Sequence, residues 1–178
     1  TPSIAGDFEF CIGDNSNLNA GAGYVSYLWS NGSSSQFINV NTAGNYIVTV
    51  TDVNGCSAAT SSTIIVNPLP VPVITGVNEI CQGTTTSFNA GNYVSYIRSN
   101  GAPTSDITIG VAGTYSVTVT DVNGCVSSTS ETLTVYQLPT ATISGVSSIC
   151  FGQSSAISLD FTGEAPFAAT YTNGGNVL

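Results

Sequence analysis

The sequence predicts an all-β protein built of tandem antiparallel β-sandwiches, and composition, internal repetition and strand periodicity each support this. Charged residues make up 6% of the chain, against about 25% in an ordinary soluble domain. Ser and Thr are abundant, whereas Lys is absent and Glu is scarce. Because β-branched Thr suits strands and Lys and Glu favour helices, we expect strands throughout.

The cysteines reveal an internal repeat of about 69 residues. The early cysteines Cys11, Cys81 and Cys150 are 70 and 69 residues apart, and the late cysteines Cys56 and Cys125 are 69 apart. Other segments recur with the same spacing: residues 24–27 as 93–96, 30–32 as 99–101, and 50–56, unchanged, as 119–125. A fixed period of this length is the signature of a tandem array.

The repeat predicts two complete domains, residues 1–69 and 70–138, followed by residues 139–178 as the incomplete start of a third, divergent domain. Prolines mark both junctions, at residues 67–72 and 137–140. Proline restricts φ and has no N–H, so such segments form stiff extended connectors. We therefore expect neighbouring domains to be held end to end, as in a stalk.

Within each repeat, apolar and hydroxyl-bearing residues alternate with a period of two, as in half-buried antiparallel strands. Asn-Gly pairs follow the longest alternating segments, at residues 54–55 and 123–124, and predict hairpins. Short strands separated by such turns are the pattern of an immunoglobulin-like β-sandwich. The predicted core residues are Trp29, Tyr46, Val48, Val50, Tyr115, Val117 and Val119.

Each complete repeat has one early and one late cysteine, so we predict one disulfide per repeat, Cys11–Cys56 and Cys81–Cys125. Each would close a loop of about 45 residues, worth about 4 kcal/mol in the chain-entropy model. The partner of Cys150 is expected beyond the chain end. Disulfides favour an extracellular or cell-surface location, and without histidine a cysteine-based metal site is disfavoured.

The two repeats differ at one predicted core position, where Arg98 replaces Trp29. A buried arginine without a partner is costly. Two alternatives stay open: the Arg98 side chain extends to the surface, or it pairs with a carboxylate such as Asp106 or Glu79.

Residues 113–125, together with residues 81–83 and 27–32, resemble the immunoglobulin-like and PKD-like repeats of very large cell-surface proteins in Bacteroidota. Many of those are similar to gliding-motility-associated adhesins exported by the type IX secretion system. The resemblance covers both complete repeats and the start of a third. It implies a secreted adhesin region made of tandem sandwiches.

Composition disfavours several other functions. With a single cation and a net charge of −9, the chain lacks the basic residues that bind nucleic acid or anionic membranes. No apolar run approaches the length of a membrane span, so we expect no direct membrane insertion. No histidine is present to form a catalytic triad, and we expect no enzyme activity. No signal peptide is recognisable, and the repeat favours a piece of a longer protein.

Asp52 and Asp121 each precede an Asn-Gly turn and offer the one repeated candidate for a cofactor site. An aspartate there typically caps the turn through its own backbone. The alternative is a calcium site, because Asp-Val-Asn-Gly places oxygen ligands at alternate positions. No other cofactor is expected.

The function predicted from the sequence is the structural or adhesive repeat region of a secreted cell-surface protein, forming a rigid stalk. Its partners would be neighbouring repeats of the same chain. One alternative is a segment of an extracellular filament that associates with other copies of itself through exposed strand edges. Another is a carbohydrate-binding or spacer module of a secreted enzyme, with surface glycans bound by tyrosines, namely Tyr24, Tyr27, Tyr93 and Tyr96.

Overall fold

A computed structural model describes residues 1–163 and 165–170. In this part of the chain the named secondary-structure elements are all β-strands. The first repeat contains β1 (Glu9–Cys11), β2 (Ser16–Asn19), β3 (Ser26–Trp29), β4 (Phe37–Val40), β5 (Gly44–Thr51) and β6 (Ser57–Asn67). The second contains β7 (Glu79–Cys81), β8 (Thr86–Asn89), β9 (Ser95–Arg98), β10 (Asp106–Ile109), β11 (Gly113–Thr120) and β12 (Val126–Tyr136). The described part includes no helix that could cross a membrane.

Each repeat folds as a two-layer immunoglobulin-like sandwich. In the first, β1, β6, β5 and β3 form one sheet in that order, and β2 pairs with β4 in the other. The second repeat has the same arrangement, with sheets β7-β12-β11-β9 and β10-β8. The long strands β5 and β6 are antiparallel, whereas the short β1 runs parallel to the last residues of β6. The expected fold class is confirmed.

The core of each sandwich lies between its two sheets. Trp29, Val48 and Val50 are buried in the first core, and Val117 and Val119 are buried in the second. Their strands place alternate side chains on opposite faces, so the hydroxyl-bearing neighbours face outward.

The two tyrosines of the predicted core lie at its margin. Tyr46 and Tyr115 are half-buried and pack against the two cores. Each hydroxyl group donates a hydrogen bond to a backbone carbonyl: that of Tyr46 to Thr42 O (3.1 Å) and that of Tyr115 to Val111 O (2.8 Å). A tyrosine in this position places its ring against apolar side chains while its hydroxyl group keeps a hydrogen-bond partner.

The strands in the described part of the third repeat are the antiparallel pair β13 (Thr140–Gly145) and β14 (Ile157–Thr162). Ile143 and Ile157, on these two strands, are exposed. At the corresponding positions of the second repeat, Ile74 and Phe88 are buried. The pair thus shows an apolar surface that is core in the complete repeats.

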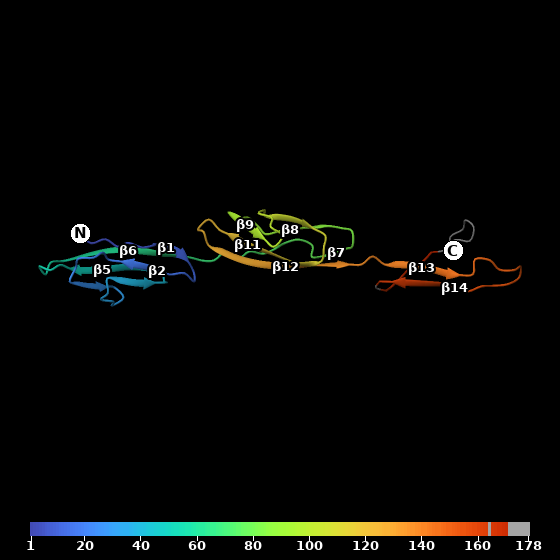
Figure 1. Cartoon of the computed structure of the whole chain (residues 1–178), viewed down its shortest axis with the longest axis horizontal. Helices are drawn as coiled ribbons and strands as arrows, with labels where there is room; N and C mark the ends of the chain where they lie inside the picture. The colour runs from blue at the N-terminus through green and yellow to red at the C-terminus, as the bar shows by residue number, and fades with distance from the viewer. Residues whose placement is uncertain (164, 171–178) are drawn as a thin grey trace.

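The three units follow one another along the longest axis of the molecule (Figure 1). The first sandwich lies at one end, β7–β12 form the middle, and β13 and β14 lie beyond the end of β12. The long strands β6 and β12 run roughly along this axis, so the two ends of each complete sandwich lie at opposite points along it.

Candidate functional site at the sandwich junction

The early cysteine of the first repeat lies at the end of its sandwich that faces the second. Cys11 is the last residue of β1 and is level with Asn67, the last residue of β6. The N–H of Ile12 donates a hydrogen bond to the carbonyl of Asn67 (2.9 Å). Cys11 is therefore anchored beside the point at which the chain leaves the first sandwich.

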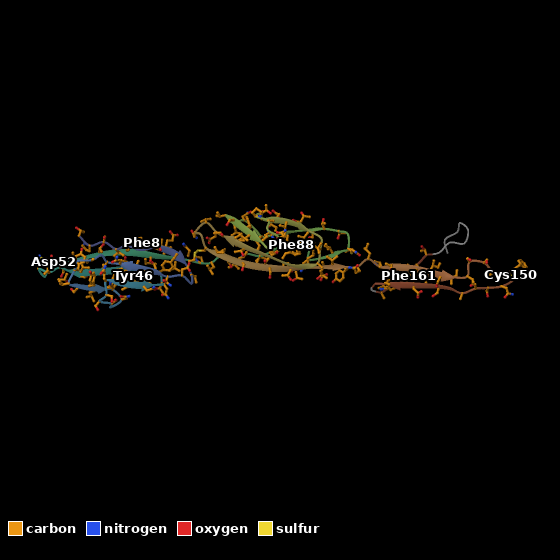
Figure 2. All side chains as sticks on the ribbon, in the orientation of Figure 1. Phe8, Tyr46, Asp52, Phe88, Cys150 and Phe161 are labelled. Carbon is orange, nitrogen blue, oxygen red and sulfur yellow. A yellow bond between two sulfur atoms is a disulfide. The ribbon has the colours of Figure 1, made fainter. Side chains whose placement is uncertain are left out.

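The late cysteine of the same repeat lies at the opposite end. Cys56 directly precedes β6 and follows the β5–β6 turn that begins at Asp52. Figure 2 places Asp52 at the outer end of the first sandwich, away from the second. The whole length of β6 separates Cys56 from the level of Cys11.

The expected pairing of Cys11 with Cys56 is therefore wrong. The 11 residues of β6 cover about 36 Å at about 3.3 Å each, whereas a disulfide needs Cα atoms about 4.4–6.8 Å apart. The expected Cys81–Cys125 bond is wrong for the same reason, because Cys81 is level with Tyr136 at the far end of the 11-residue β12.

The structure instead bonds Cys11 to Cys125, across the junction between the two sandwiches. The two Cα atoms are 5.6 Å apart, and the residues are 114 positions apart in the sequence. Cys125 is fully buried and Cys11 half-buried. The bond thus joins the outgoing end of one repeat to the incoming end of the next.

The turn that carries Cys125 is held by an aspartate. Asp121 Oδ1 accepts hydrogen bonds from the backbone N–H groups of Asn123 and Cys125, both at 2.9 Å. The N–H of Asp121 in turn donates to the carbonyl of Cys125 (3.0 Å). These three bonds fix the backbone of Cys125 in the position that the disulfide requires.

The peptide connection at the junction is short. Pro72 is buried in the second sandwich, and so is Ile74, so the chain already belongs to that sandwich at residue 72. Only residues 68–71 lie between it and the end of β6. Within the described residues no backbone–backbone hydrogen bond joins the two sandwiches. The linker and the disulfide are thus the two covalent ties of the junction.

Three cysteines, Cys56, Cys81 and Cys150, are free and exposed. Cys81 pairs with the last residue of β12, as Cys11 pairs with the last residue of β6. Cys56 precedes its long strand as Cys125 precedes β12. The free Cys56 and Cys81 therefore occupy the two outer ends of the bonded pair of sandwiches, in positions equivalent to the two bonded cysteines.

Asp52 is arranged as Asp121 is. Its Oδ1 atom accepts hydrogen bonds from the N–H groups of Asn54 and Cys56, both at 2.9 Å. Among the described residues no three Asp, Glu, Cys or His side chains gather as a metal site would require. The chemistry seen at Asp52 and Asp121 is the capping of a turn.

Arg98 is 3% exposed, in the place that Trp29 occupies in the first repeat at 2%. Trp29 Nε1 donates to the carbonyl of Ser35 (2.8 Å), and Arg98 Nε donates to the carbonyl of Thr104 (2.9 Å), the equivalent residue. The two unlike side chains therefore make the same hydrogen bond.

Neither alternative expected for Arg98 describes its contacts. Its Nη2 group donates to the carbonyls of Phe88 (3.3 Å) and Ser105, while its Nη1 group is buried without a partner. Burial lowers the pKa of Arg98, and the nearby charge of Asp106 opposes this effect. Arg98 is thus a buried cation held by backbone carbonyl groups. Its side chain neither reaches the surface nor pairs with a carboxylate.

Asp106 is oriented by its neighbours. The Nδ2 group of Asn89 donates to Asp106 Oδ1 (2.6 Å), and the hydroxyl group of Ser105 donates to Oδ2 (2.8 Å). These two hydrogen bonds, with a smaller contribution from the charge of Arg98, hold the pKa of Asp106 below its ordinary value.

The tyrosines considered for sugar stacking pack against the cores. Tyr24 and Tyr27 meet edge to face, with ring centroids 6.0 Å apart, and Tyr93 and Tyr96 repeat this contact at 6.3 Å. All four are half-buried against a core. Glycan binding by these tyrosines stays a prediction.

Comparison with known proteins gives structural likeness only. No family model matches the chain, and no curated protein matches it. Murine CEACAM1b is 10% identical, with a TM-score of 0.37 over 76% of this chain and 100% of that one. The N-terminal eight immunoglobulin domains of the Down syndrome cell adhesion molecule are 15% identical, with a TM-score of 0.43 over 99% of this chain and 37% of that one.

A third similar structure is bacterial. It belongs to a 1.5-MDa ice-binding adhesin and is 16% identical, with a TM-score of 0.41 over 83% of this chain and 69% of that one. Identities this low concern the fold alone.

Proposed function

We propose that this chain is the stalk region of a secreted cell-surface protein, a structural rather than catalytic part that carries an adhesive region away from the cell. The observation that carries the proposal is the Cys11–Cys125 disulfide across the junction of two sandwiches. A disulfide inside one domain stabilises that domain, whereas one between two domains restricts how they move relative to each other.

Two ties prevent the swivelling that one tie would permit. Inter-domain motion is the usual behaviour of domains joined by a linker with a small interface. Here residues 68–71 provide the first tie, with two prolines among them. The disulfide provides the second, with its Cα atoms 5.6 Å apart. A junction held at two places resists bending and twisting, which is the property that a stalk needs.

The same bond supports the proposed location. Disulfides persist in oxidising compartments, so the protein would function outside the cytoplasm. The resemblance of the repeats to Bacteroidota surface proteins extends this to a gliding-motility-associated adhesin exported by type IX secretion. These last features are proposed on that resemblance.

The proposal includes the neighbouring repeats of a longer array. Cys81 and Cys56 occupy positions equivalent to Cys11 and Cys125, at the two outer ends of the bonded pair. In such an array Cys81 would bond to the late cysteine of the following repeat. Cys56 would bond to the early cysteine of the preceding one, so that every junction has its own disulfide.

Residual dipolar couplings of the full chain test the stalk. With the disulfide intact, the couplings of both sandwiches should fit one alignment tensor, as for one rigid body. In the Cys11→Ser, Cys125→Ser variant, the second sandwich should need its own tensor, with smaller couplings. The Cys56→Ser, Cys81→Ser variant keeps the bond and is the matched control. Two different tensors in the control would show that the bonded junction is flexible and would refute the stalk.

A further inference from the structure

We propose that the Cys11–Cys125 bond makes the pair of sandwiches inextensible, because it gives tension a covalent route that bypasses most of the folded chain. Any pull along the molecule follows the shortest covalent path between its ends. The bond changes which residues lie on that path. This goes beyond the proposed stalk, since a rod can be straight at rest and still lengthen when it is pulled.

The path can be traced residue by residue. From the N-terminus the chain runs through residues 1–11, crosses the disulfide, and continues from Cys125 along β12 towards the third repeat. Residues 12–124, which include the β5–β6 hairpin, strand β11 and most of both cores, form a loop closed by the bond. Tension between the termini does not pass through that loop.

The part of the path that remains is already extended. The 11 residues of β12 span the second sandwich over about 36 Å as a strand at full rise. In the first sandwich, residues 1–11 run from the outer end to the junction, ending in β1 (Figure 1). Because β1 and β12 are extended strands and only residues 1–8 precede β1, pulling can lengthen either sandwich only slightly.

This route changes how force acts on stability. Forced unfolding is governed by the unfolding rate. Force raises that rate exponentially, because it lowers the barrier by the product of the force and the length gained on the way to the transition state. If the bonded sandwiches gain no length when they unfold, force does no work on their unfolding. Their resistance to a pull is then that of a covalent chain rather than of hydrogen-bonded strands.

The experiment is single-molecule force spectroscopy of the full chain, held by handles at its two termini. In the reduced chain the residues between Cys11 and Cys125 are no longer bypassed, and the two sandwiches should unfold in two steps of about 20 nm. These steps follow because about 114 residues at about 3.6 Å each give about 40 nm. The oxidised chain should show no step above about 2 nm from these sandwiches. The third repeat lies outside the loop and contributes equally to both forms.

Reduction on the same molecule, by adding dithiothreitol to the flow cell, avoids relying on a variant that fails to fold. The Cys56→Ser, Cys81→Ser variant should behave as the oxidised wild-type chain, and Cys125→Ser as the reduced one. Steps of about 20 nm in molecules whose disulfide is verified by mass spectrometry would overturn the proposal. So would a reduced chain that shows no such steps.

Discussion

Replacing Cys56, Cys81 and Cys150 by serine would leave Cys11 and Cys125 as the two remaining thiols, and their equilibrium with glutathione would then measure how the junction holds them together. The equilibrium constant for oxidation by glutathione has units of concentration. It equals the effective concentration of one thiol at the other when both disulfides are unstrained.

The structure sets the expected value. In the reduced protein the two sandwiches remain joined by residues 68–71, which span at most about 14 Å at about 3.6 Å each. One molecule confined to a sphere of that radius corresponds to about 0.1 M, which is above the millimolar values typical of short flexible linkers. We therefore expect about 0.1 M, measured by acid quenching at fixed glutathione ratios and counting protein thiols by mass spectrometry.

Lengthening the linker is the internal control. Inserting eight Gly and Ser residues after Leu69 triples the connection, and the −3/2 power dependence on length predicts a fall of about fivefold. A wild-type value above about 10 M, insensitive to the insertion, would mean that non-covalent contacts position the sandwiches. A value below about 1 mM would mean that the two cysteines are not neighbours. Either result would refute the picture of a junction held by two covalent ties.

Three further predictions concern the second sandwich. Asp121→Ala removes the acceptor of two backbone N–H groups and should lower the free energy of unfolding by about 1 kcal/mol. Millimolar calcium should leave the melting temperature of the wild-type chain unchanged, and a shift would contradict the assignment of Asp121 as a turn cap. Leu18 and Trp29 of the first repeat stand where Phe88 and Arg98 stand in the second. Combining Arg98→Trp with Phe88→Leu reproduces that pair and removes a buried charge, so denaturant unfolding should show a free energy of unfolding higher by about 1–3 kcal/mol. A lower free energy would mean that the backbone carbonyl groups around Arg98 satisfy its guanidinium group. The pKa of Asp106 is depressed in the folded state. Its carboxylate therefore stabilises the fold above the unfolded pKa of about 3.9, and this stabilisation is lost as the pH falls through the folded pKa. Asp106→Asn should make the free energy of unfolding fall less steeply at acid pH, and an unchanged slope would exclude Asp106 as a cause of that fall.

Strand positions could be predicted well because they depend on local pattern. The alternation around Val48 and Val117 places apolar residues on one face, and the Asn-Gly pairs at residues 54–55 and 123–124 end the alternating strands. These signals require only neighbouring residues, and the buried positions of the structure follow them. The repeat then made the second sandwich a copy of the first.

The Arg98 site shows where such reasoning ends. The sequence reveals that a cation stands in a position occupied by Trp29 in the first repeat. It does not reveal that the Thr104 carbonyl is the acceptor, because that contact depends on how the following loop folds back over the strand. The cost of burial is offset in part by backbone carbonyl groups, which are the same for every amino acid and leave no trace in the sequence.

The sequence by itself determined that the protein is all-β, that its repeats are equivalent, and that early and late cysteines recur in register. Only the tertiary structure decided which cysteine meets which. An 11-residue strand places Cys56 and Cys11 at opposite ends of one sandwich, and end-to-end stacking brings Cys11 to Cys125 of the next. A repeat specifies equivalence along the chain, whereas a disulfide requires two Cα atoms within about 7 Å in space, and that distance exists only after the domains have folded and stacked.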